Sequence, residues 1–286
     1  MTGTPSQDAG GDGTRDDRHT DDGTGDERRT DGGTGDDRHT NDGADGDRRR
    51  PDRPPVADEW DAIFWDVGGV ILDIDSVQEA HRRFVGRLID EHDLAIDLET
   101  ALERWRTTVG DHFREREGTE FTSARAGYAK AIEAIAGDPL PTDEWLPTFR
   151  ETVADSLETN PGAVEAIEEL AAMDLHLGVC SDADRDELLF ILEEFDVLAS
   201  FDSLTISEDV GRTKPDPAMF EAALAAADAD PERSIMIGDR YEHDMAGATE
   251  FGMTTVSHGA ADGDAVDYMV REDLTELLEI LRGDRE

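Results

Sequence analysis

Short apolar runs alternate with longer amphipathic stretches from Asp61 onwards. The run 62–65 leads into Asp66 and then two glycines, a pattern typical of a buried parallel strand that ends in a loop. Further strands are predicted near 175–180, 204–206, 235–237, 254–256 and 268–270, with helices from about 161, 184, 217 and 244 and at the end of the chain. This alternation predicts an α/β fold, a doubly wound parallel sheet with helices on both faces.

A long helical stretch separates the first strand from the second. Its apolar residues recur on one helical face, as in Leu98, Ala101, Leu102 and Trp105. Ser76 to Glu79 fits a capping box, and Asn160 followed by Pro161 predicts the start of another helix. We interpret residues 76–159 as an inserted helical cap domain, and residues 56–75 and 160–286 as the core domain.

The first 55 residues differ from the rest of the chain. They hold 15 acidic residues and 9 arginines with almost no large apolar side chain, and a polar ten-residue unit repeats within residues 13–50. Such a segment cannot bury a core, so we predict that residues 1–55 form a disordered, low-complexity tail. The alternatives are a role as an interaction arm and a start codon assigned upstream of the domain, in which case the segment is not expressed.

The charge of the chain excludes several classes of function. With a formal net charge of -44, binding to a nucleic-acid backbone or to an anionic membrane surface is strongly repelled. Cys180 is the single cysteine, which excludes an internal disulfide framework and a cysteine-rich zinc site. No apolar run is long enough to cross a membrane, so we expect a cytoplasmic protein without nucleic-acid or membrane partners.

Lysine is rare among the bases. Only Lys130 and Lys214 occur, against 25 arginines. An acidic chain with little lysine resembles the proteins of salt-accumulating halophiles. Because molar salt screens the mutual repulsion of surface charges, we predict that folding depends on salt.

Polar residues follow the predicted strands at the ends where ligands bind in doubly wound sheets. Asp66 follows the first strand, Ser181 and Asp182 follow the second, Lys214 lies in the loop after the third, and Asp239 follows the fourth. Carboxylate oxygens suit Mg²⁺, while a hydroxyl and an ammonium suit phosphate oxygens. The sequence therefore predicts a site for a divalent cation and a phosphoryl group.

Four motifs carry a resemblance to a known family. They are FWDVGGVIL at 64–72, LGVCSD at 177–182, GRTKPDP at 211–217 followed by Phe220, and IMIGD at 235–239 with Asp244 five residues on. In this order and at strand ends, they make residues 61–281 resemble the haloacid dehalogenase-like (HAD) hydrolases. That family also carries a helical cap between the first and second motifs.

The resemblance implies an Mg²⁺-dependent phosphatase that acts on a small phosphorylated metabolite. Asp66 corresponds to the nucleophile that forms an aspartyl-phosphate, which water then hydrolyses. The implied Mg²⁺ ligands are Asp66, the backbone carbonyl of Gly68 and Asp239, with Asp244 in support.

The resemblance also implies a set of phosphate-binding groups. These are the hydroxyl of Ser181, the backbone N–H of Asp182 and the ammonium of Lys214. Lys214 gains weight because one of only two lysines falls where the motif requires a compact ammonium group.

Two positions depart from the family pattern. Phosphatases of the family usually carry a second Asp, a general acid, where this chain has Gly68, so another group must supply the proton or the leaving group hardly needs one. Asp73, Asp75 and His81 are candidates to approach the leaving group and supply this proton. Asp182 replaces the commoner Asn, and its charge is unfavourable beside a phosphate unless the side chain turns away.

Two other functions remain open. A 2-haloacid dehalogenase uses the Asp nucleophile without metal, but extra carboxylates such as Asp239 and Asp244 give a metal-free site no advantage. A catalytically silent fold member, which binds a partner through its cap or its acidic tail, is kept open by Gly68.

Overall fold

The computed structural model describes residues 60–259 and 263–282. The predicted tail of residues 1–55 lies outside the described residues. Within the two described ranges, no helix combines the length and the apolar character that a membrane crossing requires.

Six strands form one sheet in which every neighbouring pair is parallel. They are β1 Ala62–Trp65, β2 His176–Ser181, β3 Ser203–Ile206, β4 Ser234–Gly238, β5 Thr254–His258 and β6 Tyr268–Val270. Their order across the sheet is β3-β2-β1-β4-β5-β6, so the chain builds outward from β1 on one side and then returns to build on the other. This reversal beside β1 defines a doubly wound sheet and confirms the predicted α/β fold.

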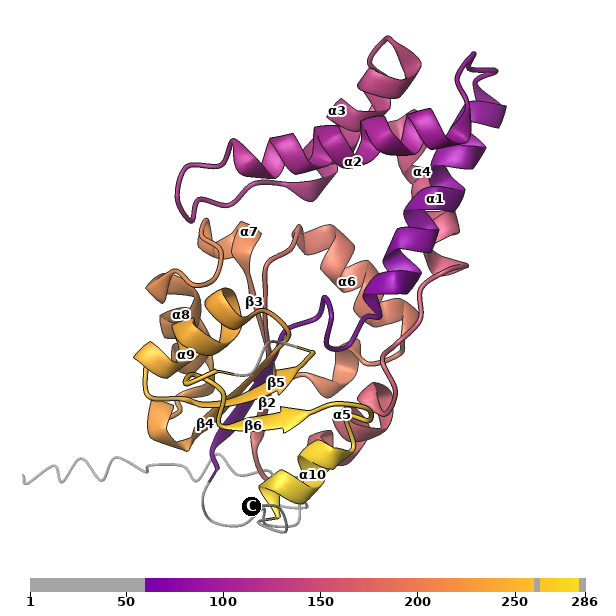
Figure 1. Ribbon diagram of the computed structural model, residues 1–286. Coiled ribbons are helices and arrows are strands. Elements are labelled where there is room, and N and C mark those ends of the chain that lie inside the picture. The colour runs from indigo at the N-terminus through magenta and orange to yellow at the C-terminus, as the bar shows by residue number, and fades with distance from the viewer. Residues whose placement is uncertain (1–59, 260–262, 283–286) are drawn as a thin grey trace, which may run out of the picture. The chain divides into compact units, whose positions relative to one another are not determined.

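Helices cover both faces of the sheet, and four more form a group of their own (Figure 1). The group between β1 and β2 consists of α1 Ile74–Glu91, α2 Leu98–Arg114, α3 Ala124–Ala136 and α4 Thr142–Ala154. The others are α5 Ala163–Ala171, α6 Arg185–Glu194, α7 Ser207–Val210, α8 Pro217–Ala227, α9 Ala246–Glu250 and α10 Glu276–Leu281. Short turns of other helix types lie at Leu198–Ser200, Pro231–Arg233 and Tyr241–Met245.

The side chains of β1 alternate between two apolar layers. Ile63 and Trp65 join a cluster that includes residues of α5, α6 and α10, whereas Ala62 and Phe64 join a second cluster with residues of α8 and α9. Because both faces are covered, the strand is apolar at every position. Asp66 is the first polar residue after this run, at the carboxyl end of the strand.

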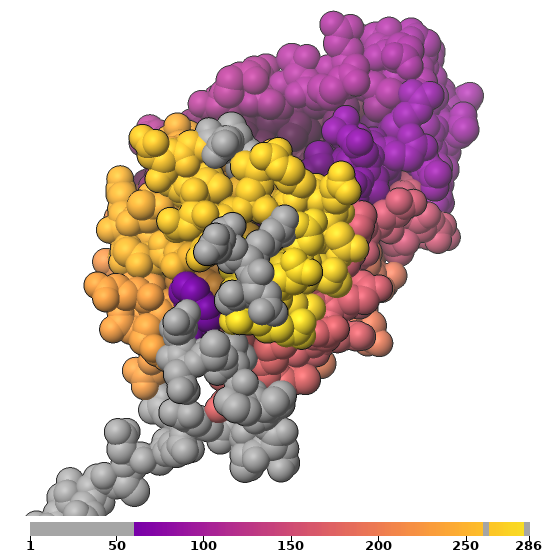
Figure 2. Space-filling model, turned by 60° about the horizontal axis from the view of Figure 1, so that its bottom comes forward, coloured from indigo at the N-terminus to yellow at the C-terminus, as the bar shows by residue number. Residues whose placement is uncertain are grey.

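The C-terminal segment completes the first of these layers. Figure 2 shows this segment (yellow) lying against the segment that contains α5 (red). The backbone N–H of Leu274 donates to the carbonyl of Pro161 at 2.9 Å, and Leu277 and Leu281 of α10 are buried in the same cluster as Ile167 of α5.

The helices α1–α4 enclose a third apolar cluster, which shares none of its buried residues with the two at the sheet. Phe84 lies at its centre, with ring centroids 5.7 Å from Trp105 and 5.1 Å from Phe149. The predicted stripe on α2 is confirmed, since Ala101, Leu102 and Trp105 are buried and Leu98 packs partly buried against the same cluster. A separate core is what a cap domain requires, and the cap itself remains a prediction.

The predicted capping box at Ser76 is wrong. Helix α1 begins at Ile74, and Asp73 is its N-cap residue, whose side chain accepts a hydrogen bond from the backbone N–H of Ser76 at 2.7 Å. The Ser76 hydroxyl donates instead to the carbonyl of Asp73. An Asp three residues ahead offers the same capping chemistry, and its carboxylate also complements the helix dipole.

The predicted helix start at Asn160 is also displaced. Helix α5 begins at Ala163, after Gly162 in a left-handed conformation with φ 74°. The side-chain amide of Asn160 donates to the carbonyls of Gly69 and Val70 at 3.1 and 2.8 Å. Asn160 therefore fastens the loop after β1 rather than capping a helix.

Two sets of contacts tie the helical group to loops at the carboxyl ends of the strands. Asp184, just before α6, accepts a hydrogen bond from the backbone N–H of Ala124 at 2.7 Å. The loop between α2 and α3 pairs with the loop that carries Lys214, where the N–H of Thr213 donates to the carbonyl of Thr119 at 2.8 Å. The helical group thus contacts the sheet edge at which ligand sites form.

Candidate active site

The chain reversal beside β1 brings three strand ends to the same level. Trp65 is in register with Val179 of β2 on one side and with Ile237 of β4 on the other. The residues that follow in each strand therefore emerge side by side. A crevice at this point of a doubly wound sheet is the usual place for a ligand.

Asp66 is almost fully buried at this point, and its carboxylate accepts several hydrogen bonds. Oδ1 accepts from the backbone N–H of Val67 at 2.8 Å and from the hydroxyl of Ser181 at 2.7 Å. Burial raises the pKa of Asp66, but Lys214, Arg240 and these hydrogen bonds together bring it below its ordinary value. Asp66 is therefore an anion held in a fixed orientation.

Lys214 is completely buried beside Asp66. Its Nζ lies 3.2 Å from Asp66 Oδ1 and 2.6 Å from Asp244 Oδ1, and it donates to the carbonyl of Cys180 at 2.8 Å. Burial lowers the pKa of Lys214, but the two carboxylates outweigh that effect and raise it above its ordinary value. The single positive charge of Lys214 thus pairs with the carboxylates of both Asp66 and Asp244.

Three carboxylates form a cluster that could hold a metal ion. Asp66, Asp239 and Asp244 each place one oxygen within 4.8 Å of the other two. Oδ1 of Asp239 is buried and accepts no hydrogen bond from the described residues. Burial and then the charges of Asp66 and Asp244 raise the pKa of Asp239 to about 6. A divalent cation satisfies a buried oxygen of this kind and relieves the repulsion, so the residues present fit Mg²⁺.

The glycines at this edge leave room for the carboxylates. A Cβ on Gly69, which has φ 79°, would lie 2.2 Å from Oδ2 of Asp239, and a Cβ on Gly238 would lie 2.2 Å from Cβ of Asp244. Gly68 is different, because a Cβ there would meet nothing within 4 Å. The space for the side chain that the resemblance leads one to expect at Gly68 is thus open.

Arg240 belongs to this site but was missed by the sequence analysis. Its guanidinium donates to Oδ2 of Asp182 at 2.8 Å and lies 3.9 Å from Oδ2 of Asp66. Oδ1 of Asp182 accepts the backbone N–H of Lys214 at 2.8 Å. Both oxygens of Asp182 are therefore engaged by donors of other loops. The position of Arg240 directly after Asp239, at a strand end, was the available signal.

Asp244 does not cap the next helix. It lies in the turn Tyr241–Met245, and its Oδ2 accepts the backbone N–H of Arg240 at 3.0 Å. This bond and the ion pair with Lys214 fix both oxygens. The structure thus brings the predicted Asp66, Ser181, Asp182, Lys214, Asp239 and Asp244 to one edge of the sheet, with Gly68 in the loop above it.

A cavity of about 200 Å³ opens beside Gly68 and Ser181 and extends to the helical group. Most of its wall is apolar, and its polar groups on the helical side include His81 and Tyr128. Burial lowers the pKa of His81 to about 4, so this imidazole is neutral at pH 7. The wall facing Gly68 therefore offers neutral hydrogen-bonding groups.

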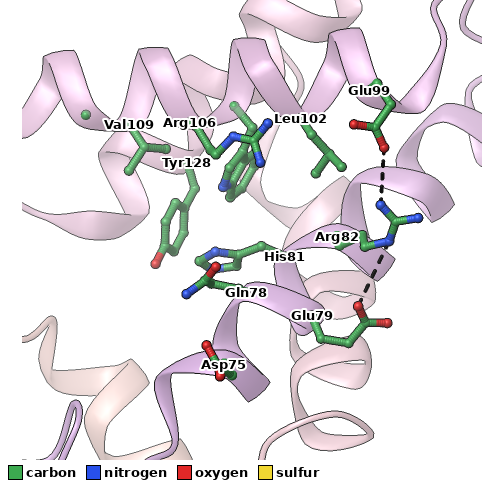
Figure 3. A pocket seen from close by; sticks show the side chains of 12 residues that line it. Asp75, Gln78, Glu79, His81, Arg82, Glu99, Leu102, Arg106, Val109 and Tyr128 are labelled. Carbon is green, nitrogen blue, oxygen red and sulfur yellow. Dashed lines mark hydrogen bonds and ion pairs between the residues drawn. The ribbon is translucent and has the colours of Figure 1, made fainter. Parts of the chain in front are cut away.

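His81 and Tyr128 also line a second cavity, of about 550 Å³, between α1 and α2 (Figure 3). Arg106 points into it, while Arg82 pairs with Glu99 at 3.4 Å at its side. The other cavities at this edge lie beyond Asp182 and beside Asp239.

Comparisons with known proteins agree with this geometry. Residues 60–252 match the haloacid dehalogenase-like hydrolase family, so the chain belongs to that family. A relative from Pyrococcus abyssi, named glyceraldehyde 3-phosphate phosphatase, is 25% identical over 68% of this chain and 79% of its own length. A relative from Halopiger xanaduensis, named ribulose-1,5-bisphosphate 5-phosphatase, is 25% identical over 68% of this chain and 83% of its own.

Solved structures show the same fold. A HAD phosphatase from Thermococcus onnurineus superposes with a TM-score of 0.59 at 22% identity, over 79% of this chain and 100% of its own. A 2-haloacid dehalogenase from Pseudomonas syringae gives a TM-score of 0.58 at 20% identity, over the same shares. Because phosphatases and dehalogenases fit equally well, the fold alone does not select between them.

Proposed function

We propose that this protein is an Mg²⁺-dependent phosphatase that hydrolyses a small phosphorylated metabolite through an aspartyl-phosphate on Asp66. The observation that carries this proposal is the cluster of three carboxylates, with a buried oxygen of Asp239 that lacks a hydrogen-bond donor among the described residues. Relatives named as phosphatases agree with it.

The chain's own groups divide the work of phosphoryl transfer. The Ser181 hydroxyl and Lys214 Nζ both converge on Oδ1 of Asp66, so a phosphoryl group that approaches this oxygen meets both donors. They would bind its oxygens together with the backbone N–H of Asp182. The carboxylate of Asp66 then attacks phosphorus, the alkoxide leaves, and water hydrolyses the acyl phosphate.

The proposed metal ligands are Asp66, the carbonyl of Gly68 and Asp239, with Asp244 in support. When bound, Mg²⁺ supplies positive charge between the anionic nucleophile and the anionic substrate. The positive charges of Lys214 and Arg240 offset part of the mutual repulsion of these carboxylates.

Gly68 carries no side chain that could protonate the leaving alkoxide. Water in the adjoining cavity would supply the proton, and the neutral side chains of His81 and Tyr128 on its wall can hydrogen-bond to that water. The helices α1–α4 act in this proposal as a cap that surrounds the leaving group.

Hydrolysis by Asp66→Asn tests the nucleophile. With Mg²⁺ in molar KCl, we expect the wild type to release phosphate from small phosphomonoesters and Asp66→Asn to be slower by about 10³-fold or more. Asp155→Asn, the same change at an exposed residue of the helical group, serves as the control. Equal rates for Asp66→Asn and the wild type would exclude Asp66 as the nucleophile.

Chelation separates the remaining alternatives. We expect EDTA to abolish phosphate release and added Mg²⁺ to restore it. Chloride release from a 2-haloacid that persists in EDTA would instead identify a dehalogenase. Absence of turnover on every phosphomonoester in molar KCl would favour a catalytically silent binding protein.

A further inference from the structure

A cavity of about 310 Å³ lies on the far side of Asp182 from Gly68, between the α2–α3 loop and the strand ends. Arg116 of that loop and Arg240 of the site both line it, with Thr122 and Thr213 as further hydrogen-bonding groups. The cavity adjoins the candidate active site through two shared wall residues, because Asp182 and Arg240 line it and Arg240 lies 3.9 Å from Oδ2 of Asp66.

The two arginines differ in how their charge is balanced. Arg240 forms a hydrogen-bonded ion pair with Asp182. Arg116 donates to the hydroxyl of Thr213 at 2.9 Å, and in the part of the chain that the structure describes it has no carboxylate partner. A half-buried guanidinium without an ion-pair partner can bind an anion at short range, even though the net charge of -44 opposes the approach of anions from a distance.

The carboxylates on the cavity wall do not supply that counter-ion. Both oxygens of Asp182 are engaged, by the N–H of Lys214 and by Arg240. Asp184 accepts hydrogen bonds from the backbone N–H groups of Ala124 and Arg125 at the start of α3, at 2.7 and 3.3 Å. Neither carboxylate of the wall therefore forms an ion pair with Arg116.

The cavity between α1 and α2 is the competing place for an anion, because Arg106 points into it without an ion-pair partner among the described residues (Figure 3). Its wall, however, carries Asp75, Glu79 and Glu99. Arg82 there is paired with Glu79 and Glu99, which leaves Asp75 to balance Arg106. That wall carries three carboxylates against two arginines, whereas the wall of the Arg116 cavity carries two of each.

We propose that the Arg116 cavity is a subsite for a second anionic group, so that the preferred substrates are phosphomonoesters whose leaving alcohol carries a carboxylate or a further phosphate. The inference rests on the proposed phosphatase activity and narrows its substrate class. Arg116 would pair with this group while Thr122 donates a hydrogen bond, and Arg240 would lie between the two anionic groups.

Substrates matched in size test this subsite. The pairs are O-phosphoglycolate and its longer homologues, each compared with the hydroxyalkyl phosphate in which CH₂OH replaces the carboxylate. With the wild type we expect a higher kcat/KM for the carboxylates. In Arg116→Gln this preference should fall by about 10- to 100-fold, with the hydroxyalkyl phosphates changed by less than about threefold. Arg116→Lys, which keeps the charge, should restore part of the preference.

A matched variant controls for the general effect of removing one positive charge from the helical group. Arg106→Gln removes the same charge from the helical group but lines the other cavity. We expect it to keep the wild-type preference. If Arg106→Gln rather than Arg116→Gln removes the preference, or if the wild type has none, the proposed subsite is wrong.

Measuring substrate binding to a catalytically inactive variant tests the subsite independently of the proposed catalysis. In the Asp66→Asn protein, the ratio of Kd values for each substrate pair should change on Arg116→Gln as the kinetic ratio does, and this measurement needs no turnover. An unchanged Kd ratio overturns the subsite even where hydrolysis is confirmed. Alkanediol bisphosphates, in which a second phosphate replaces the hydroxyl of the hydroxyalkyl phosphates, show which anionic group the subsite prefers. If Arg116→Gln weakens the bisphosphates more than the carboxylates, the second group is a phosphate.

Discussion

The edge of the sheet and the interior of the helical group are held together by different interactions. At the sheet edge, buried charges are held by one another, as when Lys214 lies within 3.2 Å of both Asp66 and Asp244. Inside the helical group the buried side chains are aliphatic and aromatic, and His81 lies among the rings of Trp105 and Phe149, with centroids at 5.3 and 5.9 Å. Ion pairs therefore hold the side chains at the sheet edge, whereas apolar packing holds those of the helical group.

This difference separates two kinds of sensitivity to mutation. Removing the partner of a buried charge costs several kcal/mol, because the remaining charge is neither hydrated nor paired. A buried aromatic ring contributes through its area and its neighbours, and a ring of similar size can replace it. The residues that carry out the proposed reaction therefore lie at the sheet edge and tolerate few substitutions. The helical group tolerates more substitutions and can adapt to different leaving groups.

The largest effect is expected for Lys214→Met. The substitution keeps most of the length of the side chain but removes the buried cation between Asp66 and Asp244, which leaves only the partly exposed Arg240 at 3.9 and 4.0 Å. We therefore expect a loss of about 3–5 kcal/mol in the free energy of unfolding. Phosphatase activity should fall by at least about 10²-fold, because a donor to the phosphoryl group is lost. Chemical denaturation in molar KCl and steady-state kinetics measure the two effects.

The other lysine gives the matched control. Lys130 lies exposed on α3, with its Nζ 3.8 Å from Glu115. An exposed pair of this kind contributes little, so Lys130→Met should change neither stability by more than about 1 kcal/mol nor kcat. Similar losses in the two variants would contradict the contrast between the regions.

The sequence was informative about the sheet edge for a physical reason. In a parallel sheet, residues that follow neighbouring strands must emerge together, so Asp66, Ser181 and Asp239 could be placed from their positions alone. The same logic reached Lys214 less directly, because it lies in a loop eight residues beyond β3, and the family resemblance added weight to its place in the site.

The helical group was less predictable. Amphipathic periodicity gives the buried face of each helix, as it did for α2, but not which faces meet across the group or where a cavity is left. The pairing of the α2–α3 loop with Thr213, and with it the position of Arg116, depends on such long-range contacts. Asp73 was missed as a cap because Ser76 offered a similar local signal.

Asp239→Asn should have an effect of intermediate size and of opposite sign. It removes one of three clustered carboxylates, so without metal we expect the protein to become more stable by about 1–2 kcal/mol. Mg²⁺ should raise the Tm of the wild type and have little effect on that of Asp239→Asn. Thermal melts in EDTA and in excess Mg²⁺ measure both. A destabilised variant with an unchanged response to Mg²⁺ would remove Asp239 from the metal site.

The smallest effect concerns the pH dependence of the helical group. Because burial lowers the pKa of His81 to about 4, the unfolded chain takes up a proton near pH 6.5 while the folded protein does not. Its contribution to stability is therefore complete above about pH 6.5 and is lost as the pH falls towards 4, by about 1–2 kcal/mol in total since the ring is partly exposed. His81→Phe, which fits among the same rings, should flatten the dependence over this range. His92→Phe, at the other end of α1, shows how much follows merely from removing a histidine. Urea denaturation at pH 7 and pH 4.5 gives the comparison, and equal pH dependences for the wild type and His81→Phe would show that the imidazole is solvated rather than enclosed by the aromatic cluster.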